Sequence, residues 1–412
     1  MKTINQIIFI LLILIIGAES SKAQTEVLPL DSVLVRLGLN PGLQAYDAKI
    51  GAQNAYAKGA KSLPAPQISA GQYQTPYSLT PNTGSFMISA EQMFTNPAKL
   101  RAKQDYMNGM SKVTAEDKNY MKNQLAAQAK GYYYNMGIIE RKRTLLASTK
   151  GLLEYMLKSA NIRLTYGKEK LNNIYKAKAD LYELDNGQEQ FNNDLKQQRI
   201  LLNILMSRDK QIDFSVDTTL MVKDYETSVT DTAMLVAVRS DIKGINQNIN
   251  LQALNAKMEY SKRKPDFGLQ AAHMFSYGGM ANQYILMGSV TIPVFSWSSK
   301  EYKANLKGIS YEVEELKQKK LDLINQVEGN LAGLRSAIKS KKILLKNYNQ
   351  NIIPALQNNY KTSLLAYEQN TGEMQVVLEG LKALKMARME ALDRLGELLQ
   401  LQVNYERENE KY

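Results

Sequence analysis

The chain of 412 residues contains no cysteine and a single histidine, His273. The absence of cysteine excludes disulfide bonds, thiolate metal sites, a cysteine nucleophile and the lipid-bearing cysteine of a bacterial lipoprotein. With one histidine, the usual zinc sites and every histidine-assisted triad would have to be built around His273. Metal-dependent hydrolases and serine hydrolases therefore fit this sequence poorly.

Blocks of one charge are also missing. Lys and Arg number 52 against 40 Asp and Glu, a net charge of +12, but the two signs are interspersed along the chain. Without basic blocks that could follow a phosphate backbone, we expect no nucleic-acid partner. A hydrophobic content of 44% and a charged content of 22% are typical of a folded protein.

The first 23 residues have the layout of a secretory signal peptide. Lys2 precedes an apolar run from Ile7 to Ile16, and the small residues Ser21 and Ala23 occupy the positions that a signal peptidase reads. The run is about half of the ~20 residues that a membrane-spanning helix needs, which disfavours a permanent anchor. We expect the mature chain to begin at Gln24 and any membrane segment after it to be β-structure.

The remaining sequence contains a duplication. The paired markers are Pro66 with Pro265, 199 residues apart, and Phe94 with Phe295 and Tyr166 with Tyr367, each 201 residues apart. Markers in one order with nearly one offset indicate two tandem repeats, residues 24–232 and 233–412. In each repeat we expect strands, at about 65–95 and 265–297, followed by long helices, at about 98–206 and 298–403.

The expected strands alternate between apolar and polar residues. From Pro265 to Tyr277, residues such as Phe267, Leu269 and Phe275 share one face, and Leu286 and Val290 continue the alternation in the partner strand. Strands of this length match the ~9–11 tilted residues that cross a bilayer. Aromatic residues near the strand ends resemble an interfacial girdle; they are Tyr73, Tyr77, Tyr277, Tyr284 and Trp297. Soluble hairpins with surface tyrosines are the alternative.

The expected helices are very long. No strong breaker occurs between Lys99 and Gly167, or between Lys300 and Pro354. A helix of about 65 residues extends for about 100 Å, too long for a compact domain. A coiled-coil seam with spacings of three and four is formed by Ile324, Val327, Leu331, Leu334 and Ile338, and a looser one by Ile139, Leu146, Leu153 and Ala160. For the helices alone, a structural coiled coil without a conduit is the alternative.

Four membrane-length strands cannot close into a barrel of usable bore, which needs about eight or more. The chain should therefore oligomerise. Two copies would supply eight strands and an interior filled by side chains, whereas three copies would supply twelve strands and a water-filled lumen.

Several short motifs in a fixed order resemble the TolC family of outer-membrane efflux proteins. The motifs are residues 39–45 (LNPGLQA), 239–242 (RSDI), the proline before each hairpin, 96–100 (NPAKL) and the spacing from Ile353-Pro354-Ala355 to Tyr367. The resemblance implies an α+β fold with a long α-helical coiled-coil barrel joined to a transmembrane β-barrel. It also implies a homotrimer with twelve strands and an equatorial belt, here residues 207–232 and the C-terminal segment.

The same resemblance implies partners and functional residues. The turn at Tyr166, Gly167 and Lys168 and the turn from Tyr367 through Gly372 to Glu373 would meet a periplasmic adaptor protein. An acidic ring past the turns would narrow the pore, with Glu379 at the second position and Asn173 at the first. The protein would lie in outer-membrane lipid, with its helices in the periplasm, and work with an inner-membrane pump of the resistance-nodulation-division type. No nucleotide-binding loop is present, so the pump would supply the energy.

The exported substrate is less defined by the sequence. Met274, Met280 and Met287 surround the second hairpin, and thioethers are soft ligands suited to Cu(I) or Ag(I). Together with Trp297 and its neighbours they resemble the heavy-metal, CusC-like branch, although methionine is more often a packing residue. Drug efflux and type I protein or peptide secretion remain alternatives. We expect no cofactor.

Two other functions fit the sequence less well. An enzyme could use paired carboxylates such as Asp180 and Glu183, but their spacing places them on one solvated helix face, so we expect no catalytic activity. A periplasmic coiled-coil adaptor or stalk should have one helical hairpin and a Gly-rich β-domain. This chain instead has two hairpins of each kind.

Overall fold

A computed structural model describes residues 27–77, 83–225, 232–293 and 295–410. The expected signal peptide (1–23), Gln24 and Val294 lie outside the described residues. Contacts divide the described chain into two compact units: the first lies within 1–40, 124–228 and 331–412, and the second within 41–123 and 229–330. Each unit contains residues of both predicted repeats, because repeats are defined by sequence similarity and units by contacts in space. The division is therefore no test of the duplication.

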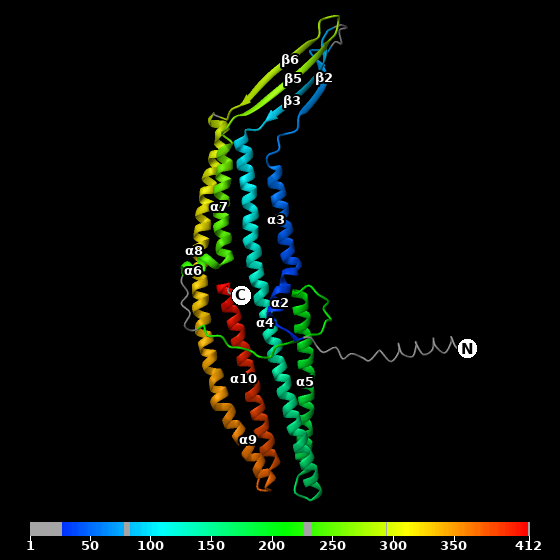
Figure 1. Cartoon of the computed structure of the whole chain (residues 1–412), viewed down its shortest axis with the longest axis vertical. Helices are drawn as coiled ribbons and strands as arrows, with labels where there is room; N and C mark the ends of the chain where they lie inside the picture. The colour runs from blue at the N-terminus through cyan, green and yellow to red at the C-terminus, as the bar shows by residue number, and fades with distance from the viewer. Residues whose placement is uncertain (1–26, 78–82, 226–231, 294, 411–412) are drawn as a thin grey trace, which may run out of the picture. The chain divides into compact units, whose positions relative to one another are not determined.

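The second unit contains a four-stranded antiparallel sheet (Figure 1). Its strands are β2 (Gln67–Tyr73), β3 (Ser85–Phe94), β5 (Asp266–Ser276) and β6 (Gln283–Thr291), in the order β2-β3-β5-β6. Strand β3 of the first hairpin pairs with β5 of the second along its whole length, from Ser85 opposite Ser276 to Phe94 opposite Phe267. Within the described chain, β2 and β6 each have one neighbour, so both outer edges of the sheet are open.

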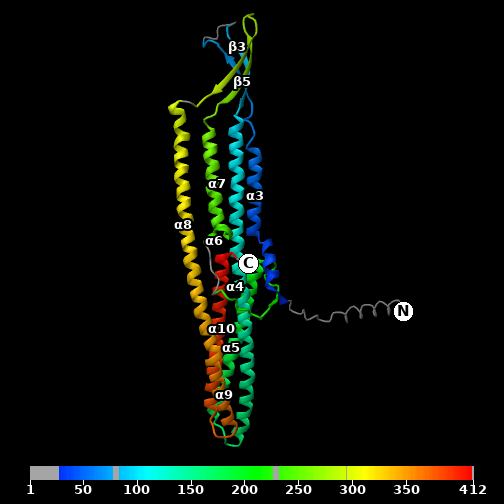
Figure 2. The ribbon, with the colours of Figure 1, turned by 60° about the vertical axis from the view of Figure 1, so that its left-hand side comes forward.

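Helices of the same unit lead into and out of these strands. They are α3 (Pro41–Gly59), α6 (Thr232–Val238), α7 (Ser240–Ser261) and the first parts of α4 (Pro97–Thr165) and α8 (Ser296–Asn347). Helices α4 and α7 approach closely at Gly109, where an added Cβ would lie 2.9 Å from the side chains of Leu251 and Leu254. The two ribbons run side by side in both Figure 1 and Figure 2.

The NPAK motif forms the junction between sheet and helix. Asn96 caps α4 because its Oδ1 accepts a hydrogen bond from the Ala98 N–H at 3.0 Å, and Pro97 occupies the first helical position. The carboxylate of Asp266 accepts hydrogen bonds from the Asn96 N–H at 2.8 Å and from Lys99 Nζ at 2.6 Å. The start of α4 is therefore tied to the start of β5.

The first unit is a helical bundle. Helix α5 (Leu171–Leu205) runs beside the second part of α4, and α9 (Ile353–Glu368) runs beside α10 (Met374–Asn409) (Figures 1 and 2). The predicted seams are largely buried, with Ile324 and Leu334 only half-buried. Leu146, Leu153 and Ala160 belong to one apolar core with Val377. Of the second seam, Val327, Leu331 and Ile338 are at most 1% exposed. None of the described helices combines the length and the apolar character needed to cross a membrane.

Pro354 lies in the path of the second long helix, and a proline inside a helix costs about 3 kcal/mol and usually bends or breaks it. The helix is interrupted only by a π-helical turn, η2 (Tyr348–Ile352), between α8 and α9, with Pro354 in the first turn of α9. Proline has no N–H for the helical hydrogen-bond ladder, and a wider turn is one of the established ways to accommodate it. The helical path therefore continues past the proline.

A short segment outside the bundle, residues 207–225, lies against α4 and α10; we call it the belt segment. Its strand β4 (Ser215–Val216) pairs in parallel with β1 (Val27–Leu28), which precedes α2 (Leu30–Arg36) and the 3-10 turn η1 (Leu37–Leu39). The hydroxyl of Tyr133 on α4 donates to the Leu28 carbonyl at 3.1 Å and accepts from the Asp217 N–H at 3.0 Å.

The C-terminal helix is held to the belt segment by a buried carboxylate. Glu406 is 6% exposed and receives hydrogen bonds from Lys130 Nζ at 2.5 Å, Lys223 Nζ at 2.7 Å and the Tyr225 hydroxyl. Burial alone would raise the pKa of Glu406, but these donors hold it below its ordinary value. Burial and the same carboxylate raise the pKa of Tyr225.

Candidate functional site

The sheet of the second unit has one exposed apolar face. In an antiparallel sheet, residues directly opposite one another point to the same side. The register places Phe94, Phe267 and Val290 in one row and Ile88, His273 and Tyr284 in another. Phe86, opposite Phe275, is half-buried. Nine other large side chains of this face are between 42% and 83% exposed; they are Ile68, Ile88, Phe94, Phe267, Leu269, Phe275, Tyr284, Leu286 and Val290.

The opposite face, here called the polar face, carries serines, Glu91 and Gln270 together with methionines such as Met274, and on the central strands its residues are buried or half-buried. Ser85 and Ser89 are 7% and 4% exposed, and the Ser89 hydroxyl lies 2.7 Å from the Ser69 hydroxyl of the neighbouring strand. Glu91 and Gln270 are opposite one another on the same face. A water-soluble sheet buries its apolar side and exposes its polar side, so this sheet has the reverse arrangement.

The five aromatic residues expected near the strand ends occupy both ends of the sheet. Tyr73 and Tyr77 lie at the hairpin end, where the Tyr277 hydroxyl donates to Gln72 Oε1 at 2.9 Å. Tyr284, near the start of β6, is 83% exposed. Trp297 is at the other end, not in a strand but in the first turn of α8, where it stacks on Phe295 with 4.7 Å between ring centroids.

The three methionines expected to surround the second hairpin do not converge. Met274 is buried on the polar face, Met287 lies on that face opposite Gln270, and Met280 is 60% exposed beyond the end of β5. Met287 is paired with Gln270, which precedes Met274 by four residues. Met287 and Met274 are therefore about 13 Å apart along the strands. The nearest thioether to Met274 by register is Met87, directly opposite on β3. Sequence reasoning missed Met87 because the pairing of β3 with β5 joins the two repeats.

The two helical turns of the first unit use glycine for geometric reasons. Gly167, between α4 and α5, has a φ of +66°, which disfavours other residues. Gly372, between α9 and α10, has backbone atoms of Ala366 and Tyr367 at 3.2 Å from the position of a Cβ. A larger residue at either position would strain its turn.

The turns are joined to one another by hydrogen bonds. Glu169 accepts from the Tyr367 hydroxyl, from Asn173 Nδ2 and from the Lys170 N–H, each at 2.8 Å. Arg163 lies over the Tyr367 ring, 4.1 Å from its centroid, and donates to Asn370 Oδ1 and the Glu368 carbonyl at 3.1 Å. We call this group of residues the turn clamp.

The electrostatics of the turn clamp follow from these contacts. Burial acts to raise the pKa of Glu169, but the hydrogen bonds from Asn173, Lys170 and Tyr367 outweigh it and hold that pKa below its ordinary value. Burial, together with the hydrogen bond to Glu169, raises the pKa of Tyr367. At neutral pH the clamp therefore pairs an ionised carboxylate with a neutral tyrosine.

The residues expected to dock an adaptor are placed differently from one another. Tyr166 is 75% exposed, and Lys168 is also exposed. Glu373 is exposed and lies 3.9 Å from Lys170, so an ion pair connects the two turns at the surface. Tyr367 is 3% exposed, and in this chain it is a packing and hydrogen-bonding residue of the turn clamp.

The two residues expected at a pore constriction also differ. Glu379 lies on the exposed side of α10, where its carboxylate accepts from Gln375 Nε2 at 2.9 Å and lies 3.7 Å from Lys176 Nζ on α5. Asn173 is 8% exposed, and its side chain is committed to Glu169. Of the two, Glu379 is the side chain accessible to solvent in the single chain.

Comparison of the whole fold with solved structures relates these features to known proteins. The outer-membrane channel OprN matches with a TM-score of 0.75 over 92% of this chain and 89% of that one, at 13% identity. CusC, whose structures concern transmembrane channel formation, matches with 0.75 over 92% and 91%, also at 13% identity. The MtrE outer-membrane channel of Neisseria gonorrhoeae matches with 0.73 over 92% and 88%, again at 13% identity.

The chain has the fold of these outer-membrane channels. The expected fold, long helices joined to a small sheet that stays open in one chain, is confirmed. The resemblance to the TolC family is thereby confirmed as a resemblance of fold. No family model and no curated protein sequence matches the chain.

Proposed function

We propose that the protein is one subunit of a homotrimeric outer-membrane channel that exports substrates from an inner-membrane pump. The observation that carries the proposal is the reversed sheet, with its apolar face exposed and its polar face buried or half-buried on the central strands β3 and β5. An apolar outer surface suits lipid, and a polar inner surface suits a water-filled lumen. The open edges of β2 and β6 could pair between copies, so three chains would supply twelve strands.

The helical unit supplies the second part of the proposal. The exposed turn residues Tyr166, Lys168 and Glu373 are the surface that we assign to a periplasmic adaptor protein. Tyr367 supports this surface from beneath, since it holds Glu169 of the facing turn. The pump is proposed to be of the resistance-nodulation-division type, and the chain is proposed to act without catalysing a reaction.

Heavy-metal cations, drugs and polypeptides remain the candidate cargo. The Met87–Met274 pair on the polar face is a soft-ligand feature that favours Cu(I) or Ag(I), although two thioethers alone make a weak site. Metal uptake by the purified channel can be compared between wild type and Met87→Leu. If wild type and Met87→Leu retain equal amounts of Ag(I), the hypothesis of metal export is contradicted, and the channel proposal is unaffected.

A matched pair of substitutions on β6 tests the channel. Leu286 is 69% exposed on the apolar face, and its neighbour Met287 is 50% exposed on the polar face. An arginine facing lipid costs about 2–4 kcal/mol near the bilayer midplane, whereas lumen substitutions change selectivity. We expect Leu286→Arg to reduce the detergent-stable trimer in outer-membrane fractions, and Met287→Arg to assemble and conduct with a shift toward anions.

Two outcomes would contradict the proposal. One is a mature wild-type chain recovered as a soluble monomer. The other is equal assembly of the two arginine variants, because it would mean that neither face contacts lipid.

The turns are tested separately. Tyr166→Glu or Lys168→Glu should abolish export while leaving trimer assembly and conductance unchanged, because both residues are exposed and belong to the turn and not to the sheet. Cross-linking from position 168 should capture the adaptor in cells that carry the cognate pump. Export at the wild-type level in both variants would remove the docking assignment.

A further inference from the structure

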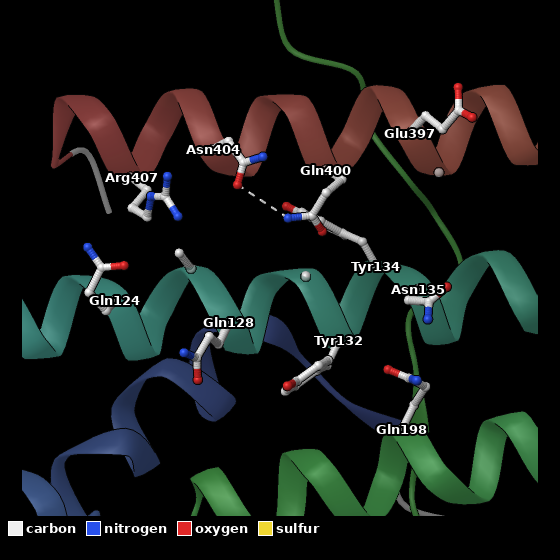
Figure 3. A pocket seen from close by; sticks show the side chains of 13 residues that line it. Gln124, Gln128, Tyr132, Tyr134, Asn135, Gln198, Glu397, Gln400, Asn404 and Arg407 are labelled. Carbon is white, nitrogen blue, oxygen red and sulfur yellow. Dashed lines mark hydrogen bonds between the residues drawn. The ribbon is translucent and has the colours of Figure 1, made fainter. Parts of the chain in front are cut away.

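A polar cleft of about 540 Å³ lies in the first unit between α4, α5 and α10 (Figure 3). Six carboxamide side chains line it: Gln124, Gln128, Asn135, Gln198, Gln400 and Asn404. Tyr132 and Tyr134 add aromatic surface, and Glu397 and Arg407 contribute one charge of each sign. The cleft shares no residue with the sheet or with the turn clamp.

The cleft lies on the side of α4 away from the belt segment. Successive residues of an α-helix are about 100° apart, so Gln124, Gln128 and Asn135 share one face of α4. Lys130 and Tyr133, which contact Glu406 and Asp217, lie on the opposite face. In the proposed trimer the belt segment encircles the outside, so α4 presents the cleft to the interior.

Helix α10 gives the same orientation independently. Gln400 and Asn404 face the cleft in Figure 3. Gln402, which exchanges hydrogen bonds with the Lys223 backbone at 2.7 and 3.2 Å, lies on the other side with Glu406. Two helices therefore place the carboxamides on one side and the belt contacts on the other.

The cleft contains an unused acceptor. The Oε1 atom of Gln198 is buried and has no hydrogen-bond partner among the described residues. The other carboxamides are weakly engaged with one another, since the only bond drawn in Figure 3 joins Gln400 Nε2 to Asn404 Oδ1 at 3.4 Å. A buried acceptor without a donor is unfavourable, so the half-buried Gln198 side chain gains if it turns Oε1 into the cleft to accept from an O–H or N–H of a ligand.

The two charged side chains that line the cleft are paired with charged neighbours, so the cleft presents no net charge to a ligand. Glu397 accepts hydrogen bonds from Lys341 and Arg394, which hold its pKa below the ordinary value although burial acts against them. Arg407 lies 3.1 Å from Glu408. Soft cations need sulfur ligands, and no methionine lines the cleft. The tyrosine rings supply apolar surface of the kind on which a sugar ring can stack. Carboxamides, which both donate and accept, match neighbouring hydroxyl groups.

We propose that the cleft is a binding site on the inner wall of the conduit for neutral, hydroxyl-rich solutes of the oligosaccharide type. Its volume lies within the ~300–1,000 Å³ of small-molecule sites. The proposal rests on the proposed function for the orientation of the cleft, but binding itself requires only the folded chain.

The test measures binding of maltohexaose to the detergent-solubilised full-length protein by calorimetry, and block of its conductance in planar bilayers. Gln198→Leu removes the unused acceptor and should weaken maltohexaose binding about tenfold. Gln190→Leu, an exposed substitution two turns earlier on α5, is the matched control and should bind as wild type does. Polyethylene glycol of equal size, which lacks donors within the chain, should block both variants equally.

The outcomes separate this inference from the channel proposal. A conducting wild type that maltohexaose blocks no better than polyethylene glycol overturns the cleft alone, and so does equal binding by wild type and Gln198→Leu. Binding without any conductance supports the cleft and overturns the channel. Because Gln198→Leu removes an unsatisfied group, it should melt at or above the wild-type temperature, so lost binding cannot be attributed to unfolding.

Discussion

The sheet of the second unit and the bundle of the first bury opposite kinds of side chain. In the bundle, Val377 and Leu398 are not exposed at all, and charged residues such as Glu379 lie outside. In the sheet, Ser89 is buried and Leu286 is 69% exposed. One chain thus follows two rules of burial. Under the proposed function the physical reason is that the two regions meet different solvents, water for the bundle and lipid for one face of the sheet.

The largest effect should come from placing one charge in each region. Val377→Asp puts a carboxylate into the apolar core of the bundle and should destabilise it by about 4 kcal/mol or more. Leu286→Asp places the same group on an exposed face and should leave the melting of the helices in detergent unchanged. Thermal melts followed by circular dichroism compare the two, and equal losses would break the contrast between the regions.

The buried carboxylate of the belt should give the next effect. Lys130→Met leaves Glu406 buried with Lys223 and Tyr225 only, and removal of one partner from a buried pair costs about 3 kcal/mol. Chemical denaturation measures the loss. Lys118→Met, which breaks an exposed pair with Asp47, is the control and should change stability by less than about 1 kcal/mol.

The same carboxylate predicts a pH dependence. Because folding lowers the pKa of Glu406, its contribution to stability is present above the unfolded value of ~4.3 and is lost as the pH falls through the folded value. The stability difference between wild type and Glu406→Gln should therefore be largest at neutral pH and shrink below about pH 4. A difference that stays constant down to pH 3 would show that Glu406 does not titrate with folding.

The turn clamp should respond more weakly. Tyr367→Phe removes the hydroxyl that donates a hydrogen bond to Glu169. The turn clamp should lose about 1 kcal/mol of stability, and amide hydrogen exchange should become faster in both turns. Tyr166→Phe, at an exposed position of the same turn region, should leave the exchange unchanged. If both variants exchange as wild type does, the hydrogen bond does not hold the turns together.

The smallest expected effect concerns ion preference. In the proposed trimer, three copies of Glu379 around one axis would concentrate cations at the mouth of the channel, with Lys176 in each copy as a partial counter-charge. Glu379→Gln should weaken cation selectivity and block by multivalent cations, most clearly at low salt. Wild-type preference in this variant would make Glu379 an ordinary surface residue.

Sequence patterns predicted individual helices and strands because each one depends on the residues of a short stretch of chain. Alternation predicted both faces of β5, the three-four spacing predicted the burial of Leu331 and Ile338, and Asn96 with Pro97 marked the start of α4. Trp297 was placed near the end of a strand because nothing in its immediate neighbourhood separates the end of β6 from the first turn of α8.

Features that join distant segments were decided by the tertiary structure alone. The pairing of β3 with β5 set Met87 against Met274, Glu169 met Tyr367 across 198 residues, and Lys130 met Glu406 across 276. The unused acceptor of Gln198 is a feature of the same kind. Whether its Oε1 finds a hydrogen-bond donor depends on which residues of α4, α5 and α10 pack around it. Sequence period fixes which side of an element a residue occupies, whereas only packing fixes which residue it meets there.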